Sequence, residues 1–167
     1  VKMVKTEDGT AIEGGKQIAS WTSDGSEHKI KDLADGTYTL TEDQAPLGYQ
    51  TAETITFEIK EGKLVDSENA KDGVVTMEDK QYKTDIQVSK VAAGGGEELP
   101  GAELTVKMVK TADGTDIEGG KQIASWTSDG SAHEIKDLAD GTYTLTEDQA
   151  PLGYKTAETI TFEIKER

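Results

Sequence analysis

The sequence contains no cysteine among its 167 residues. Disulfide bridges and thiolate metal sites are therefore excluded, and a small domain made from this chain needs another source of stability. Aromatic residues make up only 5% of the chain and hydrophobic residues 34%, so each folded unit can bury only a thin core. No apolar run approaches the roughly 20 residues that a membrane-spanning helix requires.

Positive charge is also scarce. The chain has 18 Lys and Arg residues against 33 Asp and Glu residues, which gives a net charge of −15. Such a surface repels nucleic acid and anionic lipid, so neither is expected as a partner. The acidic Asp-Gly turns lack the 12-residue spacing of a calcium loop, and no cofactor or metal is expected.

A long internal repeat dominates what is present. Residues 1–61 match residues 106–166 at an offset of 105, and only five positions differ. A period of this size indicates tandem domains rather than a solenoid. We expect a first repeat over 1–82 that lacks its opening strand and a second repeat over 83–167 that lacks its last strand. On this interpretation the sequence is a window on a longer array.

Short alternating runs predict an all-β fold. The stretch TITFEIKE over 54–61 places Ile55, Phe57 and Ile59 on one face, as a half-buried strand requires. Asp-Gly pairs separate such runs and predict tight turns. About seven short strands per 105-residue repeat indicate tandem small β-sandwich domains of an Ig-like or prealbumin-like type. The short connection over 80–84 favours stacking of the domains into a stiff rod.

Three kinds of ionisable residue fall on faces that should be buried. Alternation puts Glu42, and its repeat partner Glu147, on the same face as a buried Tyr and Leu. The same reasoning turns Asp79 and Lys90 inward at the ends of their strands. Each has an ordinary explanation: Lys can extend to water, a strand-end Asp can begin a turn, and an inward Glu can form a buried ion pair.

Together they also make a reactive set, because buried charges are costly and such groups tend to become neutral. A neutral Lys amine is a nucleophile. A protonated Asp offers a carbonyl carbon, and a Glu beside it can move the proton to the departing water. The sequence therefore predicts an amide cross-link with Glu42 and Glu147 as catalytic acids and with Lys90 and Asp79 as the types of residue that are joined.

Three stretches carry a resemblance to a known family. DIQVSKV followed by ELPGAEL, then YTLTEDQAPLGY, then VVTMED resemble the Cna B-type domains (SpaA-like, prealbumin-like) of Gram-positive surface proteins and pilins. The resemblance covers essentially the whole chain. It implies a spontaneous isopeptide bond between the first and last strands, with Lys90 in the Lys position, Asp79 in the acceptor position, and Glu42 and Glu147 in the Glu position.

Neither repeat holds the complete set. The first has Glu42 and Asp79, and the second has Lys90 and Glu147. We expect Lys90 not to be bonded to Asp79, because the family's bonded strands run parallel and the connection between these two is too short for a crossover. The partners implied are flanking copies of the repeat, or neighbouring chains, that supply the missing Lys and Asp strands.

These expectations favour a structural role. The chain would be a stalk or spacer of an extracellular surface protein or fibre attached to a bacterial cell wall, and not an enzyme, because each cross-link forms once. Two alternatives stay open: an adhesin module that binds host matrix or glycan, and an engineered split-domain ligation reagent.

Overall fold

A computed structural model describes residues 1–165. Its contacts divide the chain into two compact units. The first unit comprises Val1–Ala45 and Thr51–Lys80, and the second comprises Pro46–Gln50 and the chain from Gln81 onward. Each unit has its own hydrophobic core.

The first unit is built on a five-stranded antiparallel sheet with the order β2-β1-β3-β4-β5, accompanied by a small hairpin of β6 and β7. The strands are β1 (Lys2–Thr6), β2 (Ala11–Gln17), β3 (Gly36–Leu40), β4 (Ile55–Lys60), β5 (Lys63–Leu64), β6 (Ala70–Lys71) and β7 (Val74–Val75).

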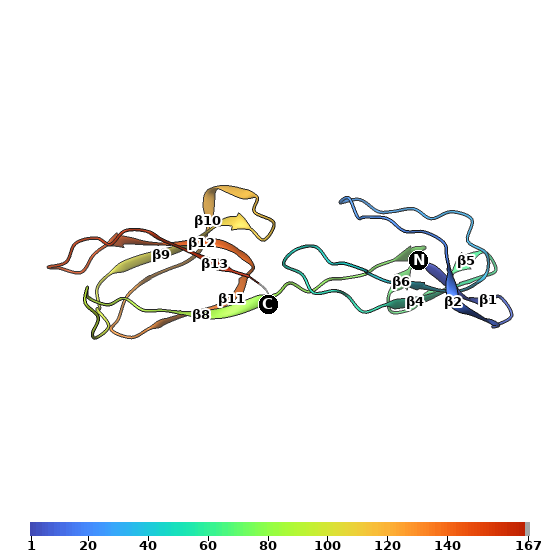
Figure 1. Ribbon diagram of the computed structural model, residues 1–167, viewed down its shortest axis with the longest axis horizontal. Helices are drawn as coiled ribbons and strands as arrows, with labels where there is room; N and C mark the ends of the chain where they lie inside the picture. The colour runs from blue at the N-terminus through green and yellow to red at the C-terminus, as the bar shows by residue number, and fades with distance from the viewer. Residues whose placement is uncertain (166–167) are drawn as a thin grey trace. The chain divides into compact units, whose positions relative to one another are not determined.

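The second unit has two sheets, one of four strands in the order β10-β9-β12-β13 and one of two strands, β11-β8. The strands are β8 (Lys83–Val88), β9 (Glu103–Thr111), β10 (Asp116–Thr127), β11 (His133–Ala139), β12 (Gly141–Gln149) and β13 (Ile160–Ile164). In Figure 1, β8 and β11 form one layer and β9, β12 and β13 the other.

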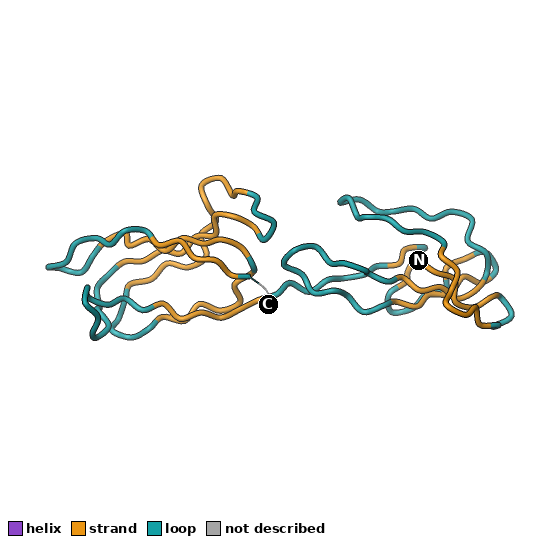
Figure 2. The backbone as a smooth tube through the Cα atoms, in the orientation of Figure 1, coloured by secondary structure: helices purple, strands orange, loops and turns teal. Residues whose placement is uncertain are grey.

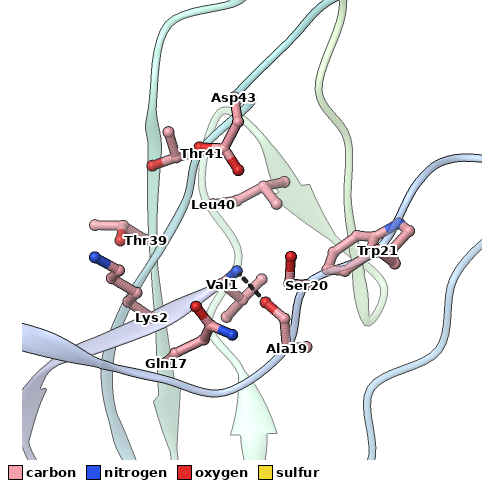
Figure 3. A pocket seen from close by; sticks show the side chains of 10 residues that line it. All are labelled: Val1, Lys2, Gln17, Ala19, Ser20, Trp21, Thr39, Leu40, Thr41 and Asp43. Atoms are coloured by element: carbon pink, nitrogen blue, oxygen red, sulfur yellow. Dashed lines mark hydrogen bonds between the residues drawn. The ribbon is translucent and has the colours of Figure 1, made fainter.

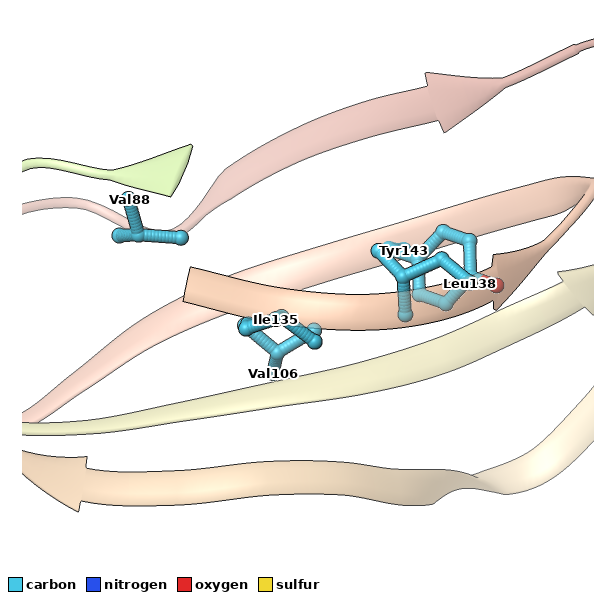
Figure 4. Packing of buried hydrophobic residues seen from close by; sticks show 5 residues of the cluster. All are labelled: Val88, Val106, Ile135, Leu138 and Tyr143. Carbon is cyan, nitrogen blue, oxygen red and sulfur yellow. The ribbon is translucent and has the colours of Figure 1, made fainter. Parts of the chain in front are cut away.

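The core of the second unit lies between these two layers. Val88, Ile135 and Leu138 come from the two-stranded sheet, and Val106 and Tyr143 come from the four-stranded sheet (Figure 4). Alternation along each strand sends these side chains to one face. The unit is therefore a small sandwich, as the short alternating runs predict.

Nearly identical sequences, which differ only at Lys29 and Glu134, adopt different secondary structure in the two units. The stretch 133–139 is strand β11, whereas its counterpart over 28–34 forms no strand, and Figure 2 draws most of 18–35 as loop. In the second unit β11 pairs with β8. Among the described residues of the first unit, no strand pairs with 28–34, so the backbone groups of this stretch stay outside any sheet.

The all-β class is confirmed. Strands account for every regular element among residues 1–165, and helices are absent from that range. The described part of the chain accordingly contains no helix that is long and apolar enough to cross a membrane.

Candidate functional site

A carboxylate lies at the edge of the core in the second unit. Glu147 belongs to β12 and pairs across the sheet with Leu104 of β9, and only 6% of its surface is exposed. Its Oε1 accepts a hydrogen bond of 2.6 Å from the backbone N–H of Ala157. Its Oε2 is buried and, within the described residues, has no hydrogen-bond partner.

The Lys90 amine approaches that same oxygen. Lys90 Nζ lies 3.5 Å from Glu147 Oε2, with 19% of the Lys side chain and 2% of the Glu side chain exposed. Lys90 follows β8, where Ile86 and Val88 face the core and Gln87 and Ser89 face outward. The inward direction expected for Lys90 is therefore observed, and the contact is a long ion pair rather than a hydrogen bond.

The first unit repeats the arrangement of the carboxylate. Glu42 Oε1 accepts a hydrogen bond of 2.8 Å from the N–H of Ala52, which is the counterpart of Ala157. Glu42 is half-buried and lies just beyond β3, whereas Glu147 lies within β12. The difference follows from strand pairing: β9 pairs with β12 as far as Gln149, whereas the pairing of β1 with β3 extends only to Thr39.

Asp79 lies beside Glu42 in the first unit. Burial raises the pKa of Asp79, and a side-chain hydrogen bond with Glu42 and the negative charge of Glu42 raise it further. Although β7 ends at Val75, the side chains of Val75, Met77 and Asp79 are half-buried, and those between them are exposed. The inward face expected for Asp79 is thus observed beyond the end of the strand.

Two half-sites result. The structure brings Glu42 to Asp79 in the first unit and Lys90 to Glu147 in the second. It does not bring all three kinds of residue together in either unit. Because Glu42 and Glu147 are equivalent positions of one repeat, the two units show the same carboxylate with two different neighbours, an acid in one case and an amine in the other.

Sequence reasoning missed two local features. The amides of Ala52 and Ala157 fix the carboxylates, and no sequence signal marks them. Each of the two His residues stacks on a Trp: the ring centroids lie 4.1 Å apart for Trp21 and His28 and 4.2 Å apart for Trp126 and His133. The spacing of seven residues around an Asp-Gly turn could have indicated this pair.

A metal site is absent from the described residues, since no group of three His, Asp or Glu side chains there could hold an ion. The residues of the two half-sites offer an amine, an acid and a carboxylate. The raised pKa favours the uncharged form of Asp79, and the ion pair places the Lys90 nitrogen beside a carboxylate that can accept its proton, which would make the amine nucleophilic.

Comparison with known proteins identifies the domains. The family model of the SpaA prealbumin-like fold domain matches residues 2–74 and again residues 84–167. No curated protein matches the chain. Among solved structures, the Bacillus anthracis TIE protein is 30% identical with a TM-score of 0.57, over 80% of this chain and 23% of that one. The present chain thus spans about a quarter of the length of that protein.

A mutant of the shaft pilin SpaA from Lactobacillus rhamnosus GG is 18% identical, over 77% of this chain and 58% of that one. Its TM-score is 0.38, which does not establish a common arrangement. The two family matches together cover nearly all of the sequence, and each contains one copy of the internally repeated sequence. The chain belongs to the SpaA prealbumin-like domain family and carries two copies of its domain.

Proposed function

We propose that the chain is a structural stalk or spacer of an extracellular bacterial surface protein or fibre, in which each complete repeat is locked by an isopeptide bond. The observation that carries this proposal is the shared position of Glu42 and Glu147. One repeat shows the acid at this carboxylate, and the other shows the amine there. A repeat with both strands would hold amine and acid at a single Glu.

The proposed reaction is a condensation. The neutral Lys amine attacks the carboxyl carbon of the protonated Asp, the C–O bond to one hydroxyl breaks, and water leaves. The Glu takes a proton from the amine and passes it to the departing oxygen. Because the fold holds both groups in place, the effective concentration is very high, on the order of 10⁵ M or more. The products are one amide and one water, and two costly ionisable groups disappear from the core.

The bond would benefit a chain under tension. It joins the first and last strands of a repeat, so that the load bypasses the rest of the sandwich. It also closes a loop of roughly 90 residues, which is worth about 4–5 kcal/mol in the chain-entropy account used for disulfides. A cross-link that forms once per domain is not turnover, so the protein is not proposed to be an enzyme.

The proposal assigns the partners as well. Each half-site lacks a strand that a flanking repeat or a neighbouring chain would supply, carrying Lys for the first unit and Asp for the second. The domain boundary near 82–83 follows from the same scheme, since Asp79 ends one repeat and Lys90 begins the next.

A chain with one complete repeat tests the proposal. Joining a second copy of the sequence 62–82 after residue 166 gives the second unit its acceptor strand. We expect this extended chain to lose one water, about 18 Da, on folding. A loss of ammonia is not expected, because the acceptor is Asp rather than Asn.

The repeat provides a matched control. Glu147→Gln in the extended chain should slow or abolish the loss of water, because an amide cannot carry the proton. Glu42→Gln should leave it unchanged, because the first unit has no Lys strand. Equal effects of the two substitutions would contradict the assignment of Glu147.

A further inference from the structure

Lys90 is held by its backbone as well as by its side chain. Its N–H donates a hydrogen bond of 3.3 Å to Glu98 Oε1, and its carbonyl accepts one of 2.7 Å from the N–H of Leu99. Val91 and Glu98 form an isolated antiparallel bridge beside these contacts. Residues 98 and 99 therefore bind both backbone groups of Lys90.

These contacts lie beyond the end of β8. The last pair between β8 and β11 joins Val88 to His133, and Lys90 lies two residues further along the chain. Its Nζ nevertheless lies 3.5 Å from Glu147 Oε2, with only 19% of the Lys side chain exposed. A Lys side chain has several rotatable bonds and loses much freedom when it is ordered. A fixed backbone at Lys90 lowers the number of positions that Nζ can reach.

A buried serine holds the segment that binds Lys90. Ser128 lies between β10 and β11 and is 6% exposed. Its hydroxyl donates to the Leu99 carbonyl at 2.7 Å and accepts from the Ala102 N–H at 2.9 Å. Its N–H donates to the Ala102 carbonyl at 2.8 Å, and its carbonyl accepts from the Gly101 N–H at 2.9 Å. These hydrogen bonds tie residues 99–102 to the connection between the two sheets.

The contacts of Ser128 and those of Lys90 meet at Leu99. This residue donates to Lys90 through its N–H and accepts from Ser128 through its carbonyl. Loss of the Ser128 hydroxyl would leave the Leu99 carbonyl and the Ala102 N–H without this partner, which is costly for groups inside the fold. The segment would shift to satisfy them, and the backbone of Lys90 would shift with it.

The repeat offers a counterpart of Ser128 for comparison. This counterpart is Ser23, and it is exposed. Figure 3 shows the adjoining region of the first unit, where Ser20 and Trp21 line a cavity of about 190 Å³. A substitution of Ser23 therefore changes the same residue type in the same local sequence, but at an exposed position.

We infer that Glu98 and Ser128 are positioning residues for Lys90, which fix its backbone so that Nζ is directed at Glu147. Glu98 acts on the Lys90 N–H directly, and Ser128 acts through Leu99. The inference rests on the proposed function for its consequence, the rate of amide formation. The placement of the amine itself is a property of the 167-residue chain and needs no cross-link.

Acetylation of the full chain with acetic anhydride measures this placement. Digestion and mass spectrometry give the rate at each Lys, and Lys83, which is exposed on β8, is the internal reference. We expect Glu98→Ala and Ser128→Ala to raise the rate at Lys90 at least about threefold, in line with the loss of a hydrogen bond. Glu98→Gln should behave like the parent, because its amide oxygen still accepts from the Lys90 N–H. Ser23→Ala should also behave like the parent.

Leu138→Ala separates positioning from stability. Leu138 is 2% exposed in the same core and pairs with Thr84, at the far end of β8 from Lys90. The variant should destabilise the second unit at least as much as Ser128→Ala, as measured by urea unfolding, yet leave acetylation of Lys90 at the parent rate.

The extended chain gives a second readout. There Glu98→Ala and Ser128→Ala should slow the loss of water at least about tenfold, because a small misplacement of a reacting group costs that much or more. Glu98→Gln and Leu138→Ala should leave the rate close to that of the parent.

Unchanged acetylation of Lys90 in both the Glu98→Ala and the Ser128→Ala chains would overturn the inference, as would an equal rise in the Leu138→Ala chain. If Ser128→Ala does not fold, the comparison of Glu98→Ala with Glu98→Gln decides, and equal rates in these two would overturn the inference. If the extended parent chain folds but retains its full mass, the cross-link fails, while acetylation of the 167-residue chain still decides the positioning.

Discussion

At the scale of single residues, the two half-sites differ in how they accommodate a buried charge. In the second unit Lys90 compensates Glu147, whose side chain is 2% exposed. In the first unit burial and the neighbouring Glu42 raise the pKa of Asp79, which favours its uncharged form. Both arrangements reduce the cost of an isolated buried charge.

The ion pair makes a prediction for stability. Lys90→Met should destabilise the second unit by about 3 kcal/mol, because it leaves a buried carboxylate without its cation. Lys90→Met combined with Glu147→Leu should recover most of that loss, because apolar groups of similar volume need no partner. Urea unfolding in the Trp21→Phe background, followed by Trp126, measures both. A double variant no more stable than Lys90→Met would contradict the account.

Asp79 makes a prediction for pH dependence. A folded pKa above the unfolded value means that the folded state holds the proton more tightly, so the contribution of Asp79 to stability falls as pH rises from about 4 through the folded pKa. Asp79→Asn removes this dependence. The stability of the Asn variant relative to the parent should therefore rise between acidic and neutral pH, as measured by unfolding of the first unit in the Trp126→Phe background. A difference that is flat with pH would contradict the raised pKa.

At the scale of elements, pairing between β9 and β12 requires a glycine at the start of β12. A Cβ on Gly141 would lie 2.5 Å from the Lys110 carbonyl oxygen and 2.5 Å from Met108 Cε, and a Cβ on Gly36 would meet the equivalent atoms at similar distances. The Met side chain can move, but the backbone oxygen can move only if the ladder between the strands changes. The closeness is thus a property of this strand pair in both units.

Gly141→Ala should consequently destabilise the second unit by about 2–3 kcal/mol. Gly130→Ala is the control: Gly130 also has a positive φ, but a Cβ there would meet nothing within 4 Å. Its cost should be smaller, because only the backbone conformation is penalised. Thermal unfolding of the two variants tests the difference, and equal costs would show that close packing at Gly141 is unimportant.

The sequence predicted that the chain forms short strands, but it did not predict which of the repeated stretches would form them in each unit. Alternation predicted the inward faces of Ile55 and Phe57, and it correctly turned Lys90 and Glu147 towards the core. It could not predict that residues 28–34 form no strand, while their repeat counterpart over 133–139 forms β11. That outcome depends on β8, a partner distant in sequence, and a local pattern contains no information on whether such a partner is present.

The candidate site shows the same division. Alternation along the strands predicted that Glu147, Asp79 and Lys90 face inward. The contacts that hold each Glu, from the N–H groups of Ala52 and Ala157, come from loop backbones and leave no trace in side-chain pattern. The Trp–His stacks lie across an Asp-Gly turn, and their centroid distances of 4.1 and 4.2 Å are nearly the same in both units, although only in the second unit do strands flank the turn.

At the scale of the whole molecule, each repeat contains a different half of the proposed cross-linking site. Asp79 belongs to the first unit and Lys90 to the second, and each has a Glu as its neighbour. The proposed cross-link should therefore be absent from the 167-residue chain and present once a repeat is complete. Lys90 and Asp79 of the same chain should not be joined.

Intact-mass spectrometry of the folded 167-residue chain and of its extended form tests the central claim most directly. The account predicts the full sequence mass for the first and a loss of one water, about 18 Da, for the second, with a branched peptide after digestion that joins Lys90 to the Asp of the added strand. An extended chain that folds and retains its full mass would contradict the claim, as would a branched peptide that joins Lys90 to Asp79 within the 167-residue chain.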